Sequence, residues 1–524
     1  MNKEYDAIVV GGGLAGLTSA AYLCKYGYRT LVCEKNEKMG GLVNTFRHEG
    51  FAFDAGIRAF ENSGILFPML KSLGIDMEFI RNPVSIGIDD RWTRLVSKES
   101  LKDYADMLAE FFPNNKEDIT AIAREISKVM GYMDVLYGID NPLFLDSMND
   151  REYLMKTLLP WLFKYQMNIR KASKLNEPIG QYLQRFTNNT ALIDLIAQHF
   201  FKSTPSFFAL SYFSLYLDYC YPKGGTGVLA QKVRDYIAAH GGEIVTGARV
   251  TGVDAKLRQV SLADGTVIRY RKLIWAADQK TLYEQLQGTQ TPEIARKKAL
   301  TQRSSSGDSI LTLFVGTDLE TGYFESRCGA HAFYTPELRG LSTLPKWETA
   351  AEQGIPEVLD WVKRYLEITT YEISCPALRD ASLAPENKTG LIVSALMDYR
   401  LVRHLSDAGE YEAFKEVCRD KMLETLEKSL FPGLLEHTLF AMCSTPMTIE
   451  RESGNLEGAI TGWAFTNAQM PAEHTFQSIR KSIRTPVADV LQCGQWTFSP
   501  SGLPISILTG KLAADAVKKS LGKN

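Results

Sequence analysis

The chain has 524 residues, of which 45% are hydrophobic and 23% are charged, as in a globular protein long enough for two large domains. Its 59 lysines and arginines nearly balance its 61 aspartates and glutamates, so bulk electrostatic attraction to nucleic acid is excluded. The eight cysteines form no Cys-x-x-Cys pair, which argues against a zinc site or a disulfide framework. We therefore expect no metal site, and a reducing, cytoplasmic environment. The start of the chain has no signal-peptide pattern, and no apolar run is long enough for a spanning helix.

The first 41 residues predict a βαβ unit that binds a dinucleotide. A buried strand over residues 5–10 leads into the motif Gly11-x-Gly13-x-x-Gly16, a helix over 14–26 and a second strand over 29–33. The first glycine permits a tight turn, the second lets the backbone approach a pyrophosphate, and the third lets the helix pack on the strand. The helix N-terminus offers free amide groups to the phosphates. Glu34 follows the second strand, where a carboxylate accepts hydrogen bonds from ribose hydroxyls.

Two later stretches carry the same strand and helix patterns. The middle stretch predicts a helix over 227–240, strands over 243–245, 249–254 and 267–270, and a buried strand over 273–278. The last stretch predicts a strand over 487–491, then Gly494, then a helix over 504–520. We expect an α/β fold with a Rossmann-type domain assembled from residues 1–65, 220–290 and 480–524. Residues 66–219 and 291–479 would form a discontinuous α+β substrate domain.

The residues after the fingerprint resemble those of a known flavoprotein superfamily. Glu34 to Gly41 resembles the acidic-residue-to-double-glycine continuation of the amine oxidases and carotenoid desaturases, and Phe53 to Gly56 resembles their turn near the flavin ring. Arg249 to Val253 resembles the segment that meets the adenine, and Val490 to Ile505 resembles the C-terminal flavin motif. Within the superfamily, most of the chain resembles the phytoene desaturases, carotene isomerases and retinol saturases.

This resemblance implies FAD as the cofactor, because the fingerprint alone does not distinguish FAD from NAD. It also implies desaturation, saturation or isomerisation of carbon–carbon bonds in an apolar polyene, such as a carotenoid- or retinoid-like lipid. The direction of reaction and the electron partner stay open. The cofactor-binding residues expected from the fingerprint and the resemblance are Gly11, Gly13, Leu14, Ala15, Gly16, Glu34, Lys35, Gly40, Gly41, Leu42, Val250, Gly494, Leu503, Pro504 and Ile505.

Few side chains stand out as candidates for catalysis or substrate binding. Arg58 follows the turn near the flavin, where an arginine could stabilise developing negative charge or serve as an ion-pair partner. Residues 199–221 are crowded with aromatics, and Tyr212 and Phe213 are candidates for a substrate tunnel or for core packing. His199 and His331 have no spacing that marks them as proton donors, which favours structural roles.

Residues 152–174 predict a basic amphipathic helix that Pro160 interrupts or kinks. Its apolar face would consist of Leu154, Leu158, Trp161, Leu162, Tyr165 and Ile169, with Lys156, Lys164, Lys171 and Lys174 largely off that face. Such a helix can be an ordinary surface helix or can rest in a membrane interface. Peripheral membrane contact therefore stays open.

Two other functions are compatible with the same fold. One is an amine-oxidase-like flavoenzyme, and the other is a non-catalytic escort that binds lipids or prenylated proteins. The complete glycine set and Glu34 argue against the escort, which has no need of them. A dedicated NAD(P)H domain is disfavoured because the sequence has no second dinucleotide fingerprint.

Overall fold

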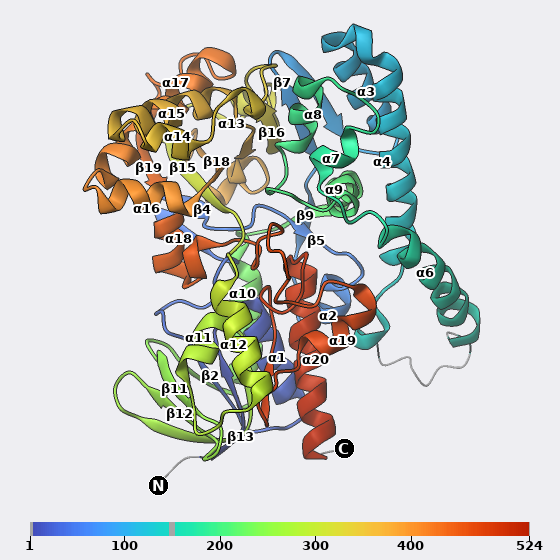
Figure 1. Ribbon diagram of the computed structural model, residues 1–524, viewed down its shortest axis with the longest axis vertical. Helices are drawn as coiled ribbons and strands as arrows, with labels where there is room; N and C mark the ends of the chain where they lie inside the picture. Colours follow the sequence, from blue (N-terminus) through green and yellow to red (C-terminus); the bar gives the residue numbers. More distant parts are fainter. Residues whose placement is uncertain (1–3, 146–151, 153, 523–524) are drawn as a thin grey trace.

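The computed structural model describes residues 4–145, 152 and 154–522. Two sheets organise it, one in each half of the molecule as drawn in Figure 1. Residues 1–3 and 523–524, at the outer ends of the predicted dinucleotide-binding domain, lie outside the described residues. So does residue 153 of the predicted basic helix.

The first sheet contains, within the described ranges, eight strands in the order β10-β2-β1-β13-β12-β11-β14, with β20 paired to β13. Their bounds are β1 (Glu4–Val10), β2 (Thr30–Cys33), β10 (Glu243–Val245), β11 (Val250–Asp254), β12 (Gln259–Leu262), β13 (Val267–Trp275), β14 (Leu286–Gln287) and β20 (Val490–Gln492). β1 pairs in parallel with β2 and β13, and β20 pairs in parallel with β13. Strands from all three predicted stretches thus lie in one sheet, and the α/β fold class with a three-segment Rossmann-type domain is confirmed.

The sequence predicted two strands, over 267–270 and 273–278, where the structure has the single strand β13. It is continuous, and its first half pairs antiparallel with β12 while its second half pairs in parallel with β1 and β20. It ends at Trp275 because Asp278 caps the next helix, α11 (Gln279–Gln285), by accepting a 2.8 Å hydrogen bond from the Thr281 amide.

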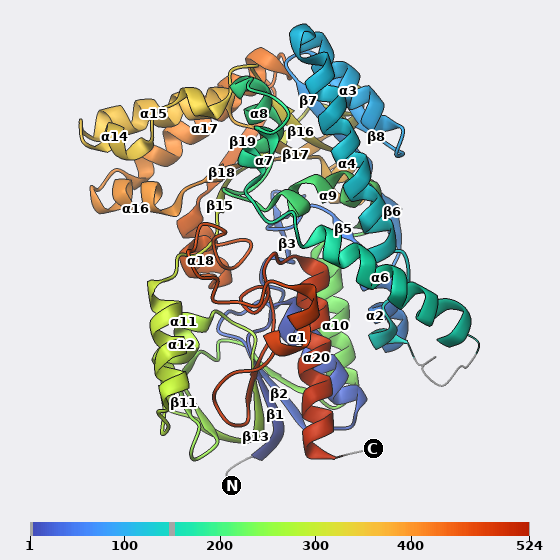
Figure 2. The same ribbon diagram turned by 45° about the vertical axis from the view of Figure 1, so that its right-hand side comes forward.

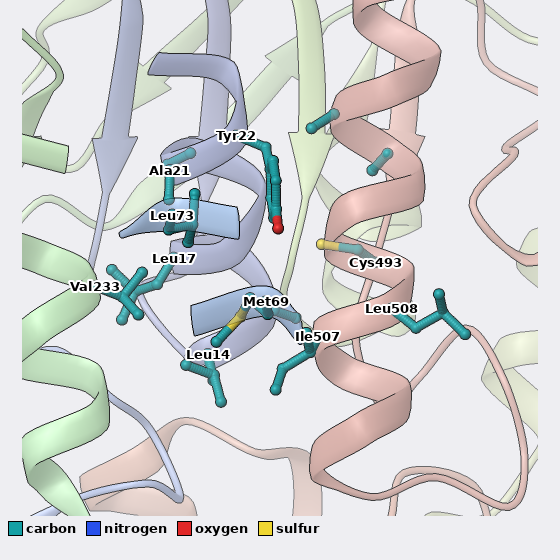
Figure 3. Close-up of a cluster of buried hydrophobic side chains, with 14 of the residues drawn as sticks. Leu14, Leu17, Ala21, Tyr22, Met69, Leu73, Val233, Cys493, Ile507 and Leu508 are labelled. Atoms are coloured by element: carbon teal, nitrogen blue, oxygen red, sulfur yellow. The ribbon is translucent and has the colours of Figure 1, made fainter. Parts of the chain in front are cut away.

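Helices cover both faces of the first sheet. α1 (Leu14–Lys25), α10 (Gly227–Ala239) and α20 (Leu503–Leu521) pack over one face, and α11 with the start of α12 (Pro292–Arg303) packs over the other. Figure 3 shows the side chains between α1 and α20. These helices approach closely because Gly510 faces α1, where an added Cβ would lie 2.5 Å from the Ala15 carbonyl oxygen.

Two segments of the predicted substrate domain pack with this first sheet. α2 (Leu66–Leu73) contributes Leu66, Met69 and Leu73 to the cluster around α1, and α12 contributes Ile294 to the cluster on the opposite face. The boundaries predicted after residues 65 and 290 therefore separate residues that share a core.

The second sheet, counted over the described residues, has seven strands in the order β19-β15-β18-β17-β16-β7-β8. Their bounds are β7 (Val84–Ile88), β8 (Arg91–Leu95), β15 (Ser309–Thr317), β16 (His331–Thr335), β17 (Tyr371–Ser374), β18 (Thr389–Met397) and β19 (Thr438–Ser444). Alternate residues such as Leu311, Ile373 and Val393 form a core with α14 (Trp347–Ala351), α15 (Ile355–Ile368), α16 (Tyr399–Asp407) and α17 (Tyr411–Ser429). The residues between them, including Ile310, Glu372 and Ser394, line a cavity on the opposite face.

A helical layer flanks the second sheet. It consists of α3 (Ser100–Phe111), α4 (Lys116–Leu136), α6 (Leu159–Ala172), α7 (Ile179–Leu183), α8 (Thr190–Ala197) and α9 (Ser206–Asp218). The remaining elements are α13 (Thr321–Glu325), α18 (Pro446–Ser453), α19 (Ile479–Ser482), the pair β3 (Thr45–His48) and β4 (Phe51–Asp54), and the small sheet of β5 (Phe60–Glu61), β9 (Tyr219–Pro222) and β6 (Phe79–Arg81).

The predicted basic helix begins differently from expectation. A π-helical turn, η4 (Leu154–Leu158), leads directly into α6, and Leu158 keeps helical backbone angles, so the helix is continuous through Pro160. Because proline has no N–H, it removes one helical hydrogen bond, and the irregular π-helical turn lies just before it. The predicted apolar face packs inward except at Leu162, which is exposed: Leu158 and Ile169 are buried, and the Trp161 indole N–H donates to the Val135 carbonyl at 2.7 Å. None of the helices in the described part of the chain has the length and apolarity needed to cross a membrane.

Candidate active site

A cavity of about 470 Å³ lies between the two sheets. One side is formed where β1, β2, β13 and β20 end, as ligand sites of parallel α/β sheets are. The other side is formed by the second sheet and by residues around α9. The cavity therefore joins the predicted dinucleotide site to the predicted substrate region.

The glycine loop shapes the first side of the cavity. Gly11 has a φ of +107°, and an added Cβ would lie 2.8 Å from the Ala276 carbonyl oxygen. Gly13 lines the cavity, and a Cβ placed on it would meet no atom within 4 Å. At Gly16 a Cβ would lie 2.0 Å from the Gly11 carbonyl oxygen, so Gly16 serves helix packing and does not line the cavity. A bound group can thus approach the backbone most closely at Gly13.

Glu34 is fixed beside this loop. One carboxylate oxygen accepts a 2.6 Å hydrogen bond from the Gly12 amide, and the other accepts a 2.9 Å bond from the Asn36 amide. The side chain is buried yet lines the cavity, as does Lys35. Each carboxylate oxygen can accept a further bond, so this arrangement suits a ribose with free hydroxyls.

Most of the other predicted cofactor residues line the same cavity. They are Leu14, Ala15, Gly40, Gly41, Leu42, Val250, Gly494 and Leu503. Pro504 and Ile505 do not line it, because they lie buried within the first turn of α20 while Gly502 and Ser506 face the space. The predicted segment therefore lies at the cavity, and Gly502, Leu503 and Ser506 are its residues that line the space.

Two helices begin at this cavity. α1 begins at Leu14 and α20 begins at Leu503, and both residues line the cavity. The first-turn amides of a helix have no intrahelical partners and carry partial positive charge. Together with the open backbone at Gly13 and the carboxylate of Glu34, these helix ends fit a dinucleotide with two phosphates.

Arg58 lies at the border between the two sides. Its guanidinium donates to the carbonyl oxygens of Asp54 and Gly56 and, at 3.1 Å, to the Ser394 hydroxyl, while Nε has no hydrogen-bond partner among the described residues. Burial lowers the pKa of Arg58, and the nearby carboxylates of Glu372 and Asp54 oppose that shift. A nearly inaccessible cation with an unused donor therefore lines the cavity.

Beyond Arg58, the second sheet contributes a hydrogen-bonded pair, His331 and Glu372. Arg379 donates at 3.1 Å to the Asn82 side-chain oxygen, which leaves the Asn82 NH₂ group to donate to His331 Nδ1 at 2.9 Å. His331 Nε2 then carries the proton and donates to Glu372 at 2.9 Å.

Their electrostatics agree with this tautomer. Burial lowers the pKa of His331. Burial acts to raise the pKa of Glu372, but the hydrogen bond from His331 and the charges of Arg58 and Arg379 outweigh it and lower the pKa. The pair is therefore a neutral imidazole beside a carboxylate at the cavity wall. No spacing in the sequence marks this pair, because its members come from the separate strands β16 and β17.

Glu61 is a second carboxyl group that sequence reasoning missed. It ends β5 and lines the cavity next to the start of α20, where a Cβ added to Gly502 would lie 3.3 Å from Glu61 Oε1. Burial raises the pKa of Glu61 to about 8, and Asp218 adds to the shift. This carboxyl group thus holds or releases a proton near neutral pH.

The two aromatic candidates on α9, Tyr212 and Phe213, lie in different surroundings. Tyr212 lines the cavity with His199, Phe201, Tyr219 and Phe333. Phe213 does not: it is buried in the helical core, with its ring centroid 5.2 Å from that of Tyr104. Of the two roles left open for Phe213, its surroundings favour core packing, because successive residues of a helix point about 100° apart.

Similarity to known proteins agrees with this geometry. The family of flavin containing amine oxidoreductases matches residues 14–331. Prolycopene isomerase of Daucus carota is 25% identical, over 99% of this chain and 81% of the isomerase. All-trans-retinol 13,14-reductase of Danio rerio is 24% identical, over 94% of this chain and 84% of the reductase. Phytoene desaturase (lycopene-forming) of Pseudescherichia vulneris is 24% identical, over 98% and 99% of the two chains.

Solved structures share the fold. A crystal structure of an oxidoreductase from Methanosarcina mazei has a TM-score of 0.62 at 14% identity, covering 98% of this chain and 99% of that chain. Reduced UDP-galactopyranose mutase has a TM-score of 0.58 at 14% identity, covering 100% of this chain and 94% of that chain. The family match spans more than half of the sequence and includes the start of α1. The chain therefore belongs to the flavin containing amine oxidoreductases, and FAD is its cofactor.

Proposed function

We propose that this flavin oxidoreductase acts on carbon–carbon bonds of an apolar polyene, a carotenoid- or retinoid-like lipid, by desaturation, saturation or isomerisation. The observation that supports the proposal most is the continuity of the cavity. The space that begins at the glycine loop ends against apolar and aromatic side chains, which are Phe201, Tyr212, Tyr219, Ile310, Phe333 and Leu396. Such a wall suits a long unsaturated chain. The names of the isomerase, reductase and desaturase relatives support the same substrate class.

We assign the cofactor to the first side of the cavity. Gly11, Gly13, Leu14 and Ala15 would meet the phosphates, and Glu34 would accept from the adenosine ribose. Lys35, Gly40, Gly41 and Leu42 would lie along the same moiety, and Val250 would meet the adenine through its backbone. Gly494, Leu503 and the first turn of α20 would face the flavin end, while Gly16, Pro504 and Ile505 would support it from behind.

A flavin held there supplies a hydride acceptor for desaturation and a hydride donor for saturation. A proton must move with each hydride, and we assign that proton to the carboxyl group of Glu61. Glu61 would take up the substrate proton in desaturation and would return a proton to the substrate in saturation. Arg58 would stabilise negative charge that develops at the same end of the cavity.

Lipid analysis tests the proposal. We expect lipids extracted from strains with and without the gene to differ in the number or geometry of conjugated double bonds, measured by mass spectrometry and absorbance. An altered amine with unaltered lipids would contradict the proposal and favour the amine-oxidase-like alternative. Purified protein that lacks flavin absorbance and does not take up FAD would favour the non-catalytic escort.

A further inference from the structure

An apolar strip runs along the outside of α6 and the π-helical turn before it. It consists of Met155, Leu159, Leu162, Phe163 and Met167, whose exposed fractions range from 41% to 70%. Met155, Leu159, Phe163 and Met167 follow one another at intervals of four residues, and Leu162 lies three residues after Leu159, so the five occupy one broad side of the helix. Other exposed large hydrophobic side chains of the described residues are spread over separate elements. We call these five residues the α6 strip.

The α6 strip is not the apolar face that the sequence predicted for membrane contact. Only Leu162 belongs to both, because Leu158, Trp161 and Ile169 pack against the body of the protein. α6 lies outside α4 and projects from the side of the molecule in Figures 1 and 2. The helix therefore has one apolar side for its own core and a second apolar side turned outward.

The charged side chains near the α6 strip are nearly all positive. Residues 154–176 contain five cationic side chains and no aspartate or glutamate; the cations are Lys156, Lys164, Arg170, Lys171 and Lys174. All five are exposed. Lys156 pairs with Glu152 at 2.8 Å, just before this range. Exposed apolar side chains beside cations that form no ion pair within the described part of the chain are complementary to a lipid bilayer, whose headgroups can be anionic and whose interior is apolar.

The packed side of α6 lies against α4, and the Trp161 indole N–H donates to the carbonyl of Val135 near the end of α4. The α6 strip lies on the other side of the helix, where its five side chains are exposed.

We propose that the α6 strip rests on the surface of a lipid bilayer that contains anionic headgroups. The apolar side chains enter the headgroup region, and Lys164, Arg170, Lys171 and Lys174 contact lipid phosphates or carboxylates. The binding needs no polyene, so it can be tested apart from the proposed function.

Vesicle flotation of the FAD-loaded protein tests this proposal. We expect the protein to float with phosphatidylcholine vesicles that contain phosphatidylserine, and to float less with phosphatidylcholine alone. Lys164→Gln with Lys171→Gln should reduce partitioning onto the anionic vesicles by about thirtyfold, since each basic residue contributes about 1 kcal/mol. Phe163→Ser with Met167→Ser should reduce it by at least about tenfold on both kinds of vesicle.

Leu257→Ser is the matched control, because Leu257 is 57% exposed but lies in the turn between β11 and β12. It should float like the unaltered protein, and every variant should keep its flavin absorbance and melting temperature. Failure of the unaltered protein to float, or flotation that ignores the changes at Phe163 and Met167, would overturn the proposal. So would a dimer in size-exclusion chromatography that Phe163→Ser converts to monomer, because the strip would then join two copies of the chain.

Discussion

The two sides of the cavity differ in how they are built. The side around β1, β2 and β20 presents backbone: glycines, helix starts and a single fixed carboxylate, Glu34. The side around β16, β17 and β18 presents side chains that hold one another, including Arg58, His331 and Glu372. A backbone site depends on conformations that few residue types permit, whereas a side-chain site depends on partners from distant parts of the chain. Substitutions should therefore affect cofactor content on the first side and chemistry on the second.

The largest effect on cofactor binding is expected at Gly13. Gly13→Val keeps an allowed conformation, since φ is −70° and ψ is 171°, but fills the space beside the helix start. We expect FAD affinity to fall by at least about a hundredfold, or about 2.7 kcal/mol, as measured by titration and visible absorbance. Gly131→Val is the control, because Gly131 is exposed and an added Cβ meets no atom within 4 Å. Full flavin content in Gly13→Val would contradict the claim that cofactor binding depends on the open backbone at this position.

Arg58 should show the opposite pattern. We expect Arg58→Met to keep FAD but to lower kcat by about a hundredfold, because a preorganised cation near the reacting atoms contributes about 3 kcal/mol. The flavin reduction potential should become more negative, and Arg58→Lys should restore it in part. An unchanged flavin reduction potential together with a lowered melting temperature would show that Arg58 has only a structural role, through its hydrogen bonds to Asp54, Gly56 and Ser394.

Two neighbouring residues of α9, one at the cavity and one in the core, should respond differently to substitution by alanine. Tyr212→Ala should raise KM for a long apolar substrate by about tenfold, or about 1.4 kcal/mol, while flavin content stays intact. Phe213→Ala should instead reduce the free energy of unfolding by about 3 to 5 kcal/mol, because it empties a core position. Steady-state kinetics and denaturant unfolding separate the two. Similar KM changes in both variants would contradict the assignment of Phe213 to the core.

The effect expected from Glu61 depends on pH. The pKa of Glu61 is about 8 in the folded protein against 4.5 ordinarily, so the folded state disfavours its charge. Its contribution is therefore absent below about pH 4.5 and becomes increasingly destabilising as the pH rises to 8. Glu61→Gln should melt at a higher temperature than the unaltered protein at pH 9 and at a similar temperature at pH 4, compared in the flavin-free state.

The same substitution tests the proton assignment. In the FAD-loaded enzyme, Glu61→Gln should remove the limb of the pH–rate profile that this carboxyl group controls. Asp218→Asn should keep this limb but move it to lower pH, because Asp218 does not line the cavity and its charge raises the pKa of Glu61. A pH–rate profile unchanged in Glu61→Gln would assign the proton to another group.

The sequence predicted the first side well because its signals are local. Gly11, Gly13 and Glu34 lie within one βαβ unit, and their spacing follows from backbone geometry. The paired strands of the three stretches also followed from hydrophobic pattern. The exact turn of α20 did not: a helix start can be located from a proline, but which residues face a cavity depends on its packing against α1.

The second side could not be predicted in the same way. His331 and Glu372 come from β16 and β17, and Asn82 and Arg379 lie in loops that only the folded chain brings together. Arg58 was found because it follows a recognisable turn, and Tyr212 because it lies in an aromatic run. In that run the residue that lines the cavity and the residue in the core are adjacent, so composition could not separate Tyr212 from Phe213. The same limit applies to α6, whose two apolar sides differ only in what covers them.

The central claim is that one cavity joins an FAD site to a wall that binds an apolar polyene. The most direct test is anaerobic mixing of the FAD-loaded protein, in oxidised and in reduced form, with phytoene, a poly-cis carotene, retinol or putrescine. We predict that at least one polyene changes the flavin absorbance, or emerges with altered double bonds, while putrescine leaves the flavin oxidised. Reduction of the flavin by the amine, with every polyene recovered unchanged, would contradict the account.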